Sequence, residues 1–135
     1  MDQRVQASFD RQTFMRTLGA TLEQAGDGTV AISLPRAETL AQQHGYLHAG
    51  ALISVMDSAC GYAALSLAPE GSEVLTSELK VNLLAPVTGA AVIARGRVIR
   101  AGRTLSVCQG DAYDVEDPSK HLATMLATMV LVTAR

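Results

Sequence analysis

One apolar stretch, Ala49–Ala68, constrains the fold more than any other part of this 135-residue chain. It is about 20 residues long, which is the length that a membrane-spanning helix needs. Asp57 lies near its centre, however, and a central Asp costs about 2.5–3.5 kcal/mol on insertion scales. Pro69-Glu70-Gly71 then provides a helix stop. We therefore expect a helix over residues 49–67 that is buried in protein on nearly all sides and does not cross a membrane.

The segments around this helix predict one short helix and several strands. Ser8 is placed to N-cap a helix over residues 8–18, with Phe9, Phe14 and Leu18 near one face. Six further segments have the composition of strands and are separated by turn residues. They are residues 21–25, 29–34, 74–84, 90–100, 104–113 and 121–132.

The segment 74–84 alternates apolar and polar residues, and we interpret the four strands after the helix as consecutive and hairpin-linked. A helix that is apolar all round must be covered all round, and a curled antiparallel sheet does this. The expected fold is α+β in a single domain, residues 1–135, with a long central helix wrapped by a curved antiparallel sheet of about six strands. One face of the strand 74–84 is predicted to carry Leu75, Ser77, Leu79, Val81 and Leu83.

Charge and cysteine content narrow the function classes. The chain has 11 Lys and Arg against 13 Asp and Glu, a net charge of −2, and so lacks the basic excess of a nucleic-acid binder. Cys60 and Cys108 form no CxxC pattern, which argues against a zinc site or a disulfide framework. Residues 1–6 lack the apolar core of a signal peptide. We expect a cytoplasmic protein with no metal, in which Cys60 is a packed core thiol.

The start of the long helix is the first candidate site. A polar loop runs from Gln42 to His48 and enters the helix at Ala49 and Gly50. Helix N-termini carry unpaired N–H groups and partial positive charge, and two small residues let a ligand approach the backbone closely. A carbonyl or oxyanion held there would be polarised. His48 is expected mainly to cap and orient this loop, since its i, i+4 spacing from His44 spans a loop and matches no metal motif.

Asp57 is the second candidate, because it is the only charged residue between His48 and Glu70. A lone carboxylate in apolar surroundings is costly unless it is paired or reaches water. It therefore either points into solvent or lines a cleft as a nucleophile or general base. Asp57 lies eight residues after Ala49, roughly 12 Å along a helix axis. One substrate carbonyl cannot meet both groups of the same chain, so a shared site would need two subunits with antiparallel helices.

These residues resemble the PaaI-like hotdog-fold acyl-CoA thioesterases over almost the whole chain, from about Phe9 to Val132. The resemblance rests on His48-Ala49-Gly50 at the start of a helix that carries Asp57, and on six residues further along the chain. Those six are Glu78, Asn82, Pro86, Gly96, Gly102 and Arg103. The resemblance implies a hotdog fold, a homodimer with shared active sites and a homotetramer.

The resemblance also implies roles for individual residues. Asp57 falls at the acidic catalytic position, and the N–H of Ala49 at the oxyanion position where the family usually has Gly. Gln42 matches a loop Asn or Gln that orients water or the thioester, and Thr76 matches a Ser or Thr that assists the Asp. His48 belongs to the same catalytic motif. The resemblance further implies that the substrate is bound by Gly50, Arg100 and Arg103, and that the two arginines contact CoA.

The implied reaction is hydrolysis of an acyl-CoA substrate without any cofactor. The thioester carbonyl is attacked either by the Asp57 carboxylate or by water that Asp57 deprotonates.

Two other functions stay open on the same fold. One is an acyl-CoA binding module without activity, suggested by Ala49 and Gln42 in place of the usual residues. The other is a hydratase or dehydratase that would use His48. An arginine cluster at residues 95–103 fits either a solvated face or phosphate recognition.

Overall fold

The computed structural model describes residues 1–133, and its order of elements follows the sequence prediction in outline. The N-terminal part forms two short helices and two strands, and one long helix then leads into four further strands. The elements are α1 (Gln3–Arg11), α2 (Thr13–Leu18), β1 (Thr21–Gly26), β2 (Thr29–Pro35), the 3-10 helix η1 (Glu38–Leu40), α3 (Ala49–Leu67), β3 (Ser72–Leu83), β4 (Ala91–Ala101), β5 (Leu105–Asp114) and β6 (His121–Thr133).

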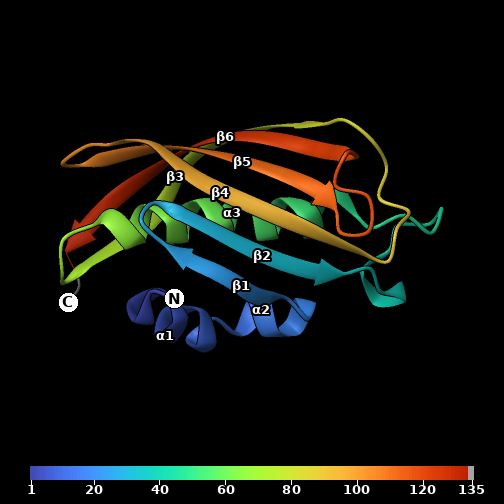
Figure 1. Ribbon diagram of the computed structural model, residues 1–135, viewed down its shortest axis with the longest axis horizontal. Helices are drawn as coiled ribbons and strands as arrows, with labels where there is room; N and C mark the ends of the chain where they lie inside the picture. The colour runs from blue at the N-terminus through green and yellow to red at the C-terminus, as the bar shows by residue number, and fades with distance from the viewer. Residues whose placement is uncertain (134–135) are drawn as a thin grey trace.

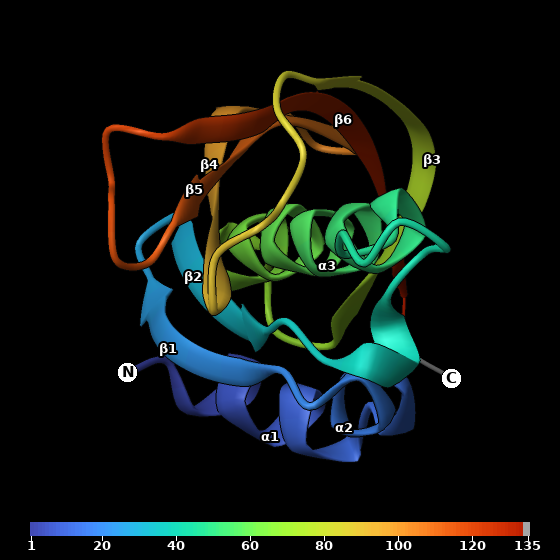
Figure 2. The same ribbon diagram turned by 90° about the vertical axis from the view of Figure 1, so that its right-hand side faces the viewer.

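Helix α3 runs through the middle of the molecule, and the sheet curves over it while α1 and α2 lie on its other side (Figure 1, Figure 2). By length and composition α3 could cross a membrane, yet most of it is covered by the rest of the fold. Burial of apolar side chains all round this helix is the main stabilising term that the fold offers. The predicted α+β hotdog architecture is confirmed. The buried residues of α3 are Leu52, Val55, Met56, Ala59, Cys60, Tyr62, Ala63, Ala64 and Leu65.

The six strands form one antiparallel sheet in the order β1-β2-β4-β5-β6-β3. The predicted β1–β2 hairpin is confirmed, and its turn has Asp27 at φ 53° and Gly28 at φ 80°, as a type I′ turn requires. The prediction of four consecutive hairpin-linked strands after the helix is wrong for the first pair and confirmed for the β4–β5 and β5–β6 hairpins. β3 pairs with β6 rather than with β4, so residues 84–90 cross the end of α3 instead of making a tight turn. β3 is consequently an edge strand.

A bulge in β3 overturns the predicted face of this strand. The pairing with β6 shifts between Thr76 and Glu78, so Ser77 is the extra residue. Because one extra residue reverses the alternation, Leu75 is on the opposite face from Leu79 and is 61% exposed. Thr76, expected on the outer face, instead points at α3. This bulge is what aims a β3 hydroxyl at the middle of α3.

The N-terminal helix begins earlier than predicted. Asp2, not Ser8, is its N-cap, since its side chain accepts hydrogen bonds from the N–H groups of Arg4 and Val5. The chain breaks at Gln12 into two helices, so Phe14 turns outward and is 51% exposed instead of joining the apolar face.

Arg4 ties α1 to the C-terminal end of α3. Its guanidinium donates to the carbonyl oxygens of Ala68 at 2.8 Å and Pro69 at 3.1 Å, and also to that of Leu65. These carbonyls belong to the last turn of α3 and the residues just after it, where intrahelical partners run out. A cation at this end also suits the helix dipole. The N-terminal helices are therefore fastened to the helix that carries Asp57.

Gly96 permits the close contact between β4 and α3. A Cβ built at this position would lie 2.5 Å from the carbonyl carbon and oxygen of Ala59. No side chain fits there, so the glycine is required by backbone packing.

Candidate active site

The middle of α3 and the edge strand β3 form a first cleft, here called the Asp57 cleft, with a volume of about 250 Å³. Thr76 Oγ1 donates a hydrogen bond of 2.7 Å to Asp57 Oδ1 and lies 3.5 Å from Sδ of Met129. Asp57 is half-buried and lines this cleft rather than standing free in solvent. The residues lining the cleft are Ser8, Gln12, Asp57, Ser58, Gly61, Tyr62, Leu65, Glu73, Val74, Leu75 and Thr76.

A polar cluster closes one side of the Asp57 cleft. Gln12, at the break between α1 and α2, donates from Nε2 to the Tyr62 hydroxyl at 2.8 Å. Its Oε1 accepts from Ser58 Oγ at 3.2 Å, and Ser8 Oγ lies 3.3 Å from the same Tyr62 hydroxyl. The sequence does not predict these contacts of Ser8, Gln12 and Ser58, because no local motif links a residue near the N-terminus to α3.

The N-terminus of α3 presents one backbone donor. His48 is the N-cap, and its Nδ1 accepts from the N–H of Gly50 at 2.7 Å, which places the ring proton on Nε2. The N–H groups of Ala51 and Leu52 donate to the His48 carbonyl. Within residues 1–133 the N–H of Ala49 has no hydrogen-bond partner, so it is the donor of this first turn that can receive an oxyanion.

Gln42 shapes the loop that enters α3. Its Oε1 accepts from the N–H groups of His44 at 2.5 Å and Tyr46 at 3.3 Å. Its backbone N–H also donates to the Tyr46 carbonyl. Since Oε1 is engaged by the loop, the amide Nε2 is the atom that Gln42 can offer to a ligand.

Ala49, Gln42 and His48 line a second cleft, here called the Ala49 cleft, of about 370 Å³. Leu52 and Leu83 lie in it, whereas Met56, one turn further along α3, is fully buried in the core. The lining is otherwise largely apolar. The residues are Gln42, Tyr46, Leu47, His48, Ala49, Leu52, Leu83, Leu84, Ala85, Pro86 and Val87.

The two clefts share no lining residue. Asp57 and Thr76 line the Asp57 cleft, and Ala49 and Leu83 line the Ala49 cleft, because β3 runs antiparallel to α3. The separation along α3 is roughly 12 Å. The two groups that the sequence predicts to act on one carbonyl therefore lie in separate clefts of each chain.

The predicted substrate-binding residues lie elsewhere. Gly50 contacts the His48 ring, where a Cβ would lie 3.0 Å from Nδ1, and lines neither cleft. Arg100 is exposed on β4 and also lines neither. Arg103 borders a separate hollow beside Ala68, at the C-terminal end of α3. The structure does not bring these residues to Asp57 or Ala49 within one chain.

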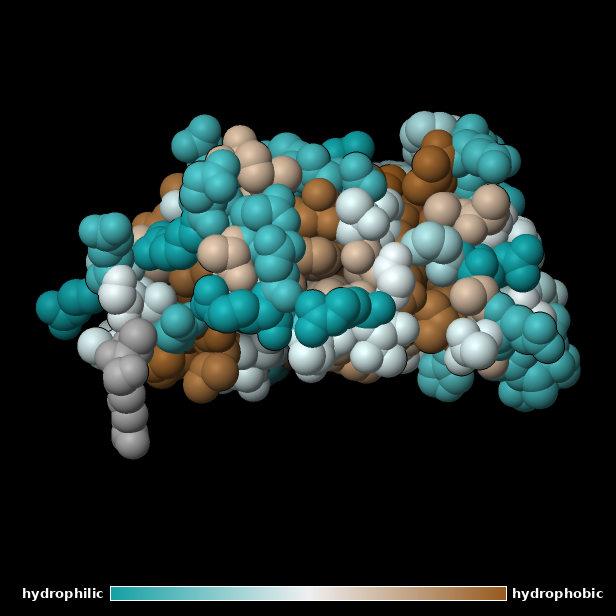
Figure 3. Space-filling model, turned by 90° about the horizontal axis from the view of Figure 1, so that it is seen from below, coloured by the Kyte–Doolittle hydropathy of each residue, from teal (hydrophilic) through white to brown (hydrophobic). Residues whose placement is uncertain are grey.

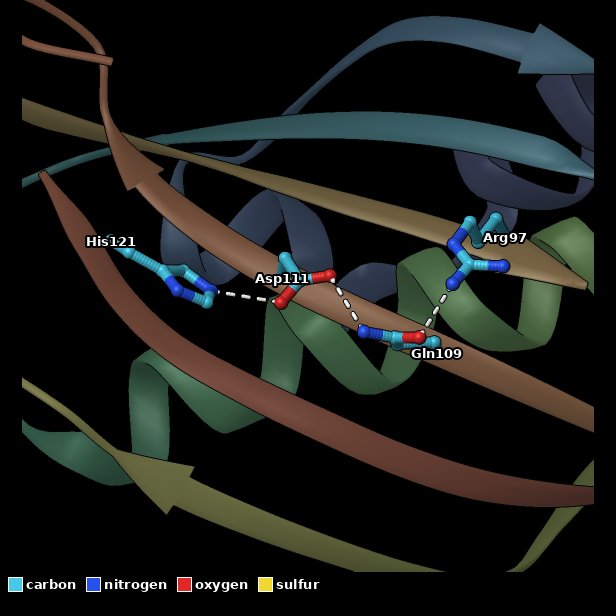
Figure 4. Close-up of polar contacts among 4 residues, drawn as sticks. All are labelled: Arg97, Gln109, Asp111 and His121. Atoms are coloured by element: carbon cyan, nitrogen blue, oxygen red, sulfur yellow. Dashed lines mark hydrogen bonds and ion pairs between the residues drawn. The ribbon is translucent and has the colours of Figure 1, made fainter. Parts of the chain in front are cut away.

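The outer face of the sheet carries a polar network that no pattern in the sequence predicts (Figure 4). Arg97 donates to Gln109 Oε1 at 2.6 Å, and Gln109 donates to Asp111 Oδ2 at 3.3 Å. His121 lies 2.8 Å from the other oxygen of Asp111 and stacks on Tyr113. Arg97 thus belongs to this network on neighbouring strands and not to a group with Arg103.

The face seen from below, which includes the N-terminal helices, is largely hydrophilic with separate hydrophobic patches between the polar residues (Figure 3).

Both cysteines are buried and unpaired. Cys60 is fully buried, and burial raises the pKa of its thiol well above the usual range, which disfavours the thiolate form that a nucleophile needs. Among residues 1–133 no group of three His, Cys, Asp or Glu side chains is arranged to hold a metal.

Comparison with known proteins gives consistent results. A profile of the thioesterase superfamily matches residues 44–120. A crystal structure of a thioesterase family protein from Silicibacter pomeroyi is 45% identical, covers 98% of both chains and superposes with a TM-score of 0.94. The PaaI protein from the phenylacetic acid degradation operon of E. coli is 19% identical, with a TM-score of 0.89 over 98% of this chain and 93% of PaaI, and so shares the fold.

A candidate esterase from Halobacterium salinarum is 31% identical over 78% of this chain and 72% of its own length. The chain spans about two thirds of the length of the curated relatives that it matches. The resemblance to PaaI-like hotdog thioesterases is confirmed for fold and family. The chain belongs to the thioesterase superfamily.

Proposed function

We propose that this protein hydrolyses acyl-CoA thioesters in a homodimer, with Asp57 of one subunit and the Ala49 N–H of the other acting on one carbonyl. Membership of the superfamily supports thioester hydrolysis in general. The observation that carries the finer proposal is the pair of half-sites. The carboxylate held by Thr76 and the unpartnered N–H of Ala49 lie in different clefts of the same chain.

The chemistry follows from these groups. The Ala49 N–H and the partial positive charge of the α3 N-terminus stabilise the negative charge that develops on the carbonyl oxygen. Asp57 takes a proton from a water molecule while the water oxygen bonds to the carbonyl carbon. The C–S bond then breaks, and the CoA sulfur takes the proton from Asp57. The products are the free acid and CoA, and no cofactor takes part.

The edge strand β3 supports the proposed dimer. An unpaired edge of 12 residues invites pairing with another strand, and Leu75 and Leu83 on β3 and Leu84 just after it are each more than half exposed. An antiparallel pair of β3 strands centred on Lys80 would put Leu83 of one copy opposite the bulge at Thr76 and Ser77 of the other. That register brings the Ala49 cleft of one subunit to the Asp57 cleft of its partner.

Complementation between two inactive variants tests the proposal. Asp57→Asn removes the base and should lower kcat by roughly 10²–10⁴-fold. Ala49→Pro removes only the N–H. Proline is tolerated at the first position of a helix, and the preceding His48 already has ψ 136°, which suits a residue before proline.

Each variant alone should be folded, dimeric and nearly inactive with acyl-CoA substrates. After the two are unfolded and refolded together, half of the dimers contain one of each chain, and each of these has one intact site out of two. About a quarter of the wild-type activity should return. Absence of any recovery from mixed dimers would show that the site is not shared.

A labelling experiment separates the two routes of attack. In a single turnover in ¹⁸O-water, the anhydride route puts label into Asp57, and the water route puts it only into the released acid. The half-buried carboxylate is placed to act in either way.

Three further expectations belong to the same proposal. We propose that two dimers associate into a tetramer, as the family resemblance implies, and that sedimentation shows this species. We propose a reducing cytoplasm as the compartment, since both thiols are unpaired. Arg100 and Arg103 remain predicted CoA contacts, tested by the rise in KM on Arg103→Ala.

A further inference from the structure

Gly61 lies one helical turn after Asp57, on the same face of α3, and lines the Asp57 cleft. Glycine is a poor residue for the interior of a helix, so its presence in the middle of the central helix calls for a cause. Backbone conformation does not require a glycine here, because Gly61 does not have a positive φ. Packing does not require a glycine either, because a Cβ at Gly61 would meet only Sδ of Met129, at 3.9 Å.

This distinguishes Gly61 from Gly96, whose Cβ would collide with the backbone of Ala59. The space that a side chain at position 61 would occupy is instead part of the cleft beside the carboxylate. The cleft is bounded beyond it by Tyr62, which Gln12 holds by a hydrogen bond, and by Leu65. A group attached to a carbonyl at Asp57 therefore has room to lie over the bare surface of Gly61.

We propose that Gly61 is a specificity-determining residue, which keeps the acyl subsite wide enough for branched or aromatic acyl groups. This inference rests on the proposed thioester hydrolysis and adds the class of acyl group to it. The methyl group of an alanine at position 61 fits the free protein but takes volume from the bound acyl group. Gly61→Ala therefore narrows the acyl subsite without destabilising the fold.

The test compares wild type and Gly61→Ala on acetyl-CoA, hexanoyl-CoA and benzoyl-CoA, with thiol release as the readout. We expect kcat/KM for acetyl-CoA to stay within about twofold, and that for benzoyl-CoA to fall by roughly 10- to 200-fold. The Tm should rise by about 2–6 °C, because alanine is the better helix former. Gly61→Val should shorten the range of accepted acyl groups further.

Ser54→Ala is the matched control, since Ser54 lies on the same helix, lines neither cleft and also gains helix propensity. It should leave the order of preference among the three thioesters unchanged. An unchanged order in Gly61→Ala would overturn the inference and leave the hydrolase intact. A lower Tm or a dissociated dimer in Gly61→Ala would also overturn it, because Gly61 would then serve packing or the contact between copies. A wild type inert toward all thioesters would instead refute the proposed function, and this inference with it.

Discussion

Thr76 Oγ1 donates a hydrogen bond of 2.7 Å to Asp57 Oδ1, linking the edge strand β3 to the middle of α3. A short bond from a hydroxyl fixes the rotation of the carboxylate and engages one of its oxygens. The other oxygen, Oδ2, is left for the reacting group. Thr76 is thereby a positioning residue that acts through Asp57.

Thr76→Val keeps the shape of the side chain and removes the donor. We expect kcat to fall by roughly 10- to 100-fold with little change in KM, because a loosely oriented carboxylate still meets substrate but attacks or deprotonates poorly. Thr76→Ser restores the hydroxyl and should recover most of the loss. Steady-state kinetics on one acyl-CoA checks this. Equal losses in the Val and Ser variants would contradict the positioning role.

Arg4→Ala should destabilise the fold by about 1–3 kcal/mol, because the carbonyls of Leu65, Ala68 and Pro69 lose a charged donor at the end of α3. Urea unfolding measures this as a lower midpoint with an unchanged slope. Arg11→Ala removes an exposed arginine from the same helix and should change stability by less than about 0.5 kcal/mol. Similar midpoints for the two variants would rule out the clamp.

Gly96→Ala should be more damaging than its size suggests. The added methyl group collides with the carbonyl of Ala59, and neither backbone can yield without moving α3 from β4. Overpacking of this kind costs about 1–3 kcal/mol or more. Thermal unfolding compares the Tm of Gly96→Ala with that of wild type. Gly61→Ala is the control, because it makes the same substitution at a position where the methyl group has space. A Tm of Gly96→Ala equal to that of wild type would show that the sheet and helix can separate without cost.

Much of this architecture could be predicted from the sequence, because it depends on local patterns. The apolar stretch around Asp57 predicts a covered helix, and six segments with turn residues between them predict an antiparallel sheet. The small residues at Ala49 and Gly50 mark a helix start open to a ligand. The separation of Ala49 from Asp57 follows from the helical rise alone, and so does the idea of two half-sites.

The remainder depends on long-range pairing, which leaves no local signal. The bulge at Ser77 is set by the register between β3 and β6, and it reverses the faces of Leu75 and Thr76. The sequence alone places Thr76 on the outer face, and only the family resemblance connects it with Asp57. Gln12 likewise enters the Asp57 cleft through the packing of α1 and α2 against α3. No spacing within the chain reveals that contact.

The buried thiols give the protein a pH dependence on the alkaline side. Burial raises the pKa of Cys108 from 9.0 to about 11, and it raises that of Cys60 further. A thiol whose pKa is higher in the folded than in the unfolded state binds more protons when folded, so stability is fully present below pH 9 and is lost as pH rises through the folded pKa. Cys108 alone accounts for a loss of roughly 2–3 kcal/mol by the time the pH passes its folded pKa.

Urea unfolding at pH 8, 9, 10 and 11 tests this, with a Cys60→Ala, Cys108→Ala double variant as the reference for the titration of Tyr and Lys. The wild type should lose more stability than the double variant above pH 9. At pH 8 neither thiol should react with a disulfide reagent until the protein is unfolded, when both should react. Rapid reaction of the native protein, or parallel stability curves for the two proteins, would show that these thiols are not held in a closed core.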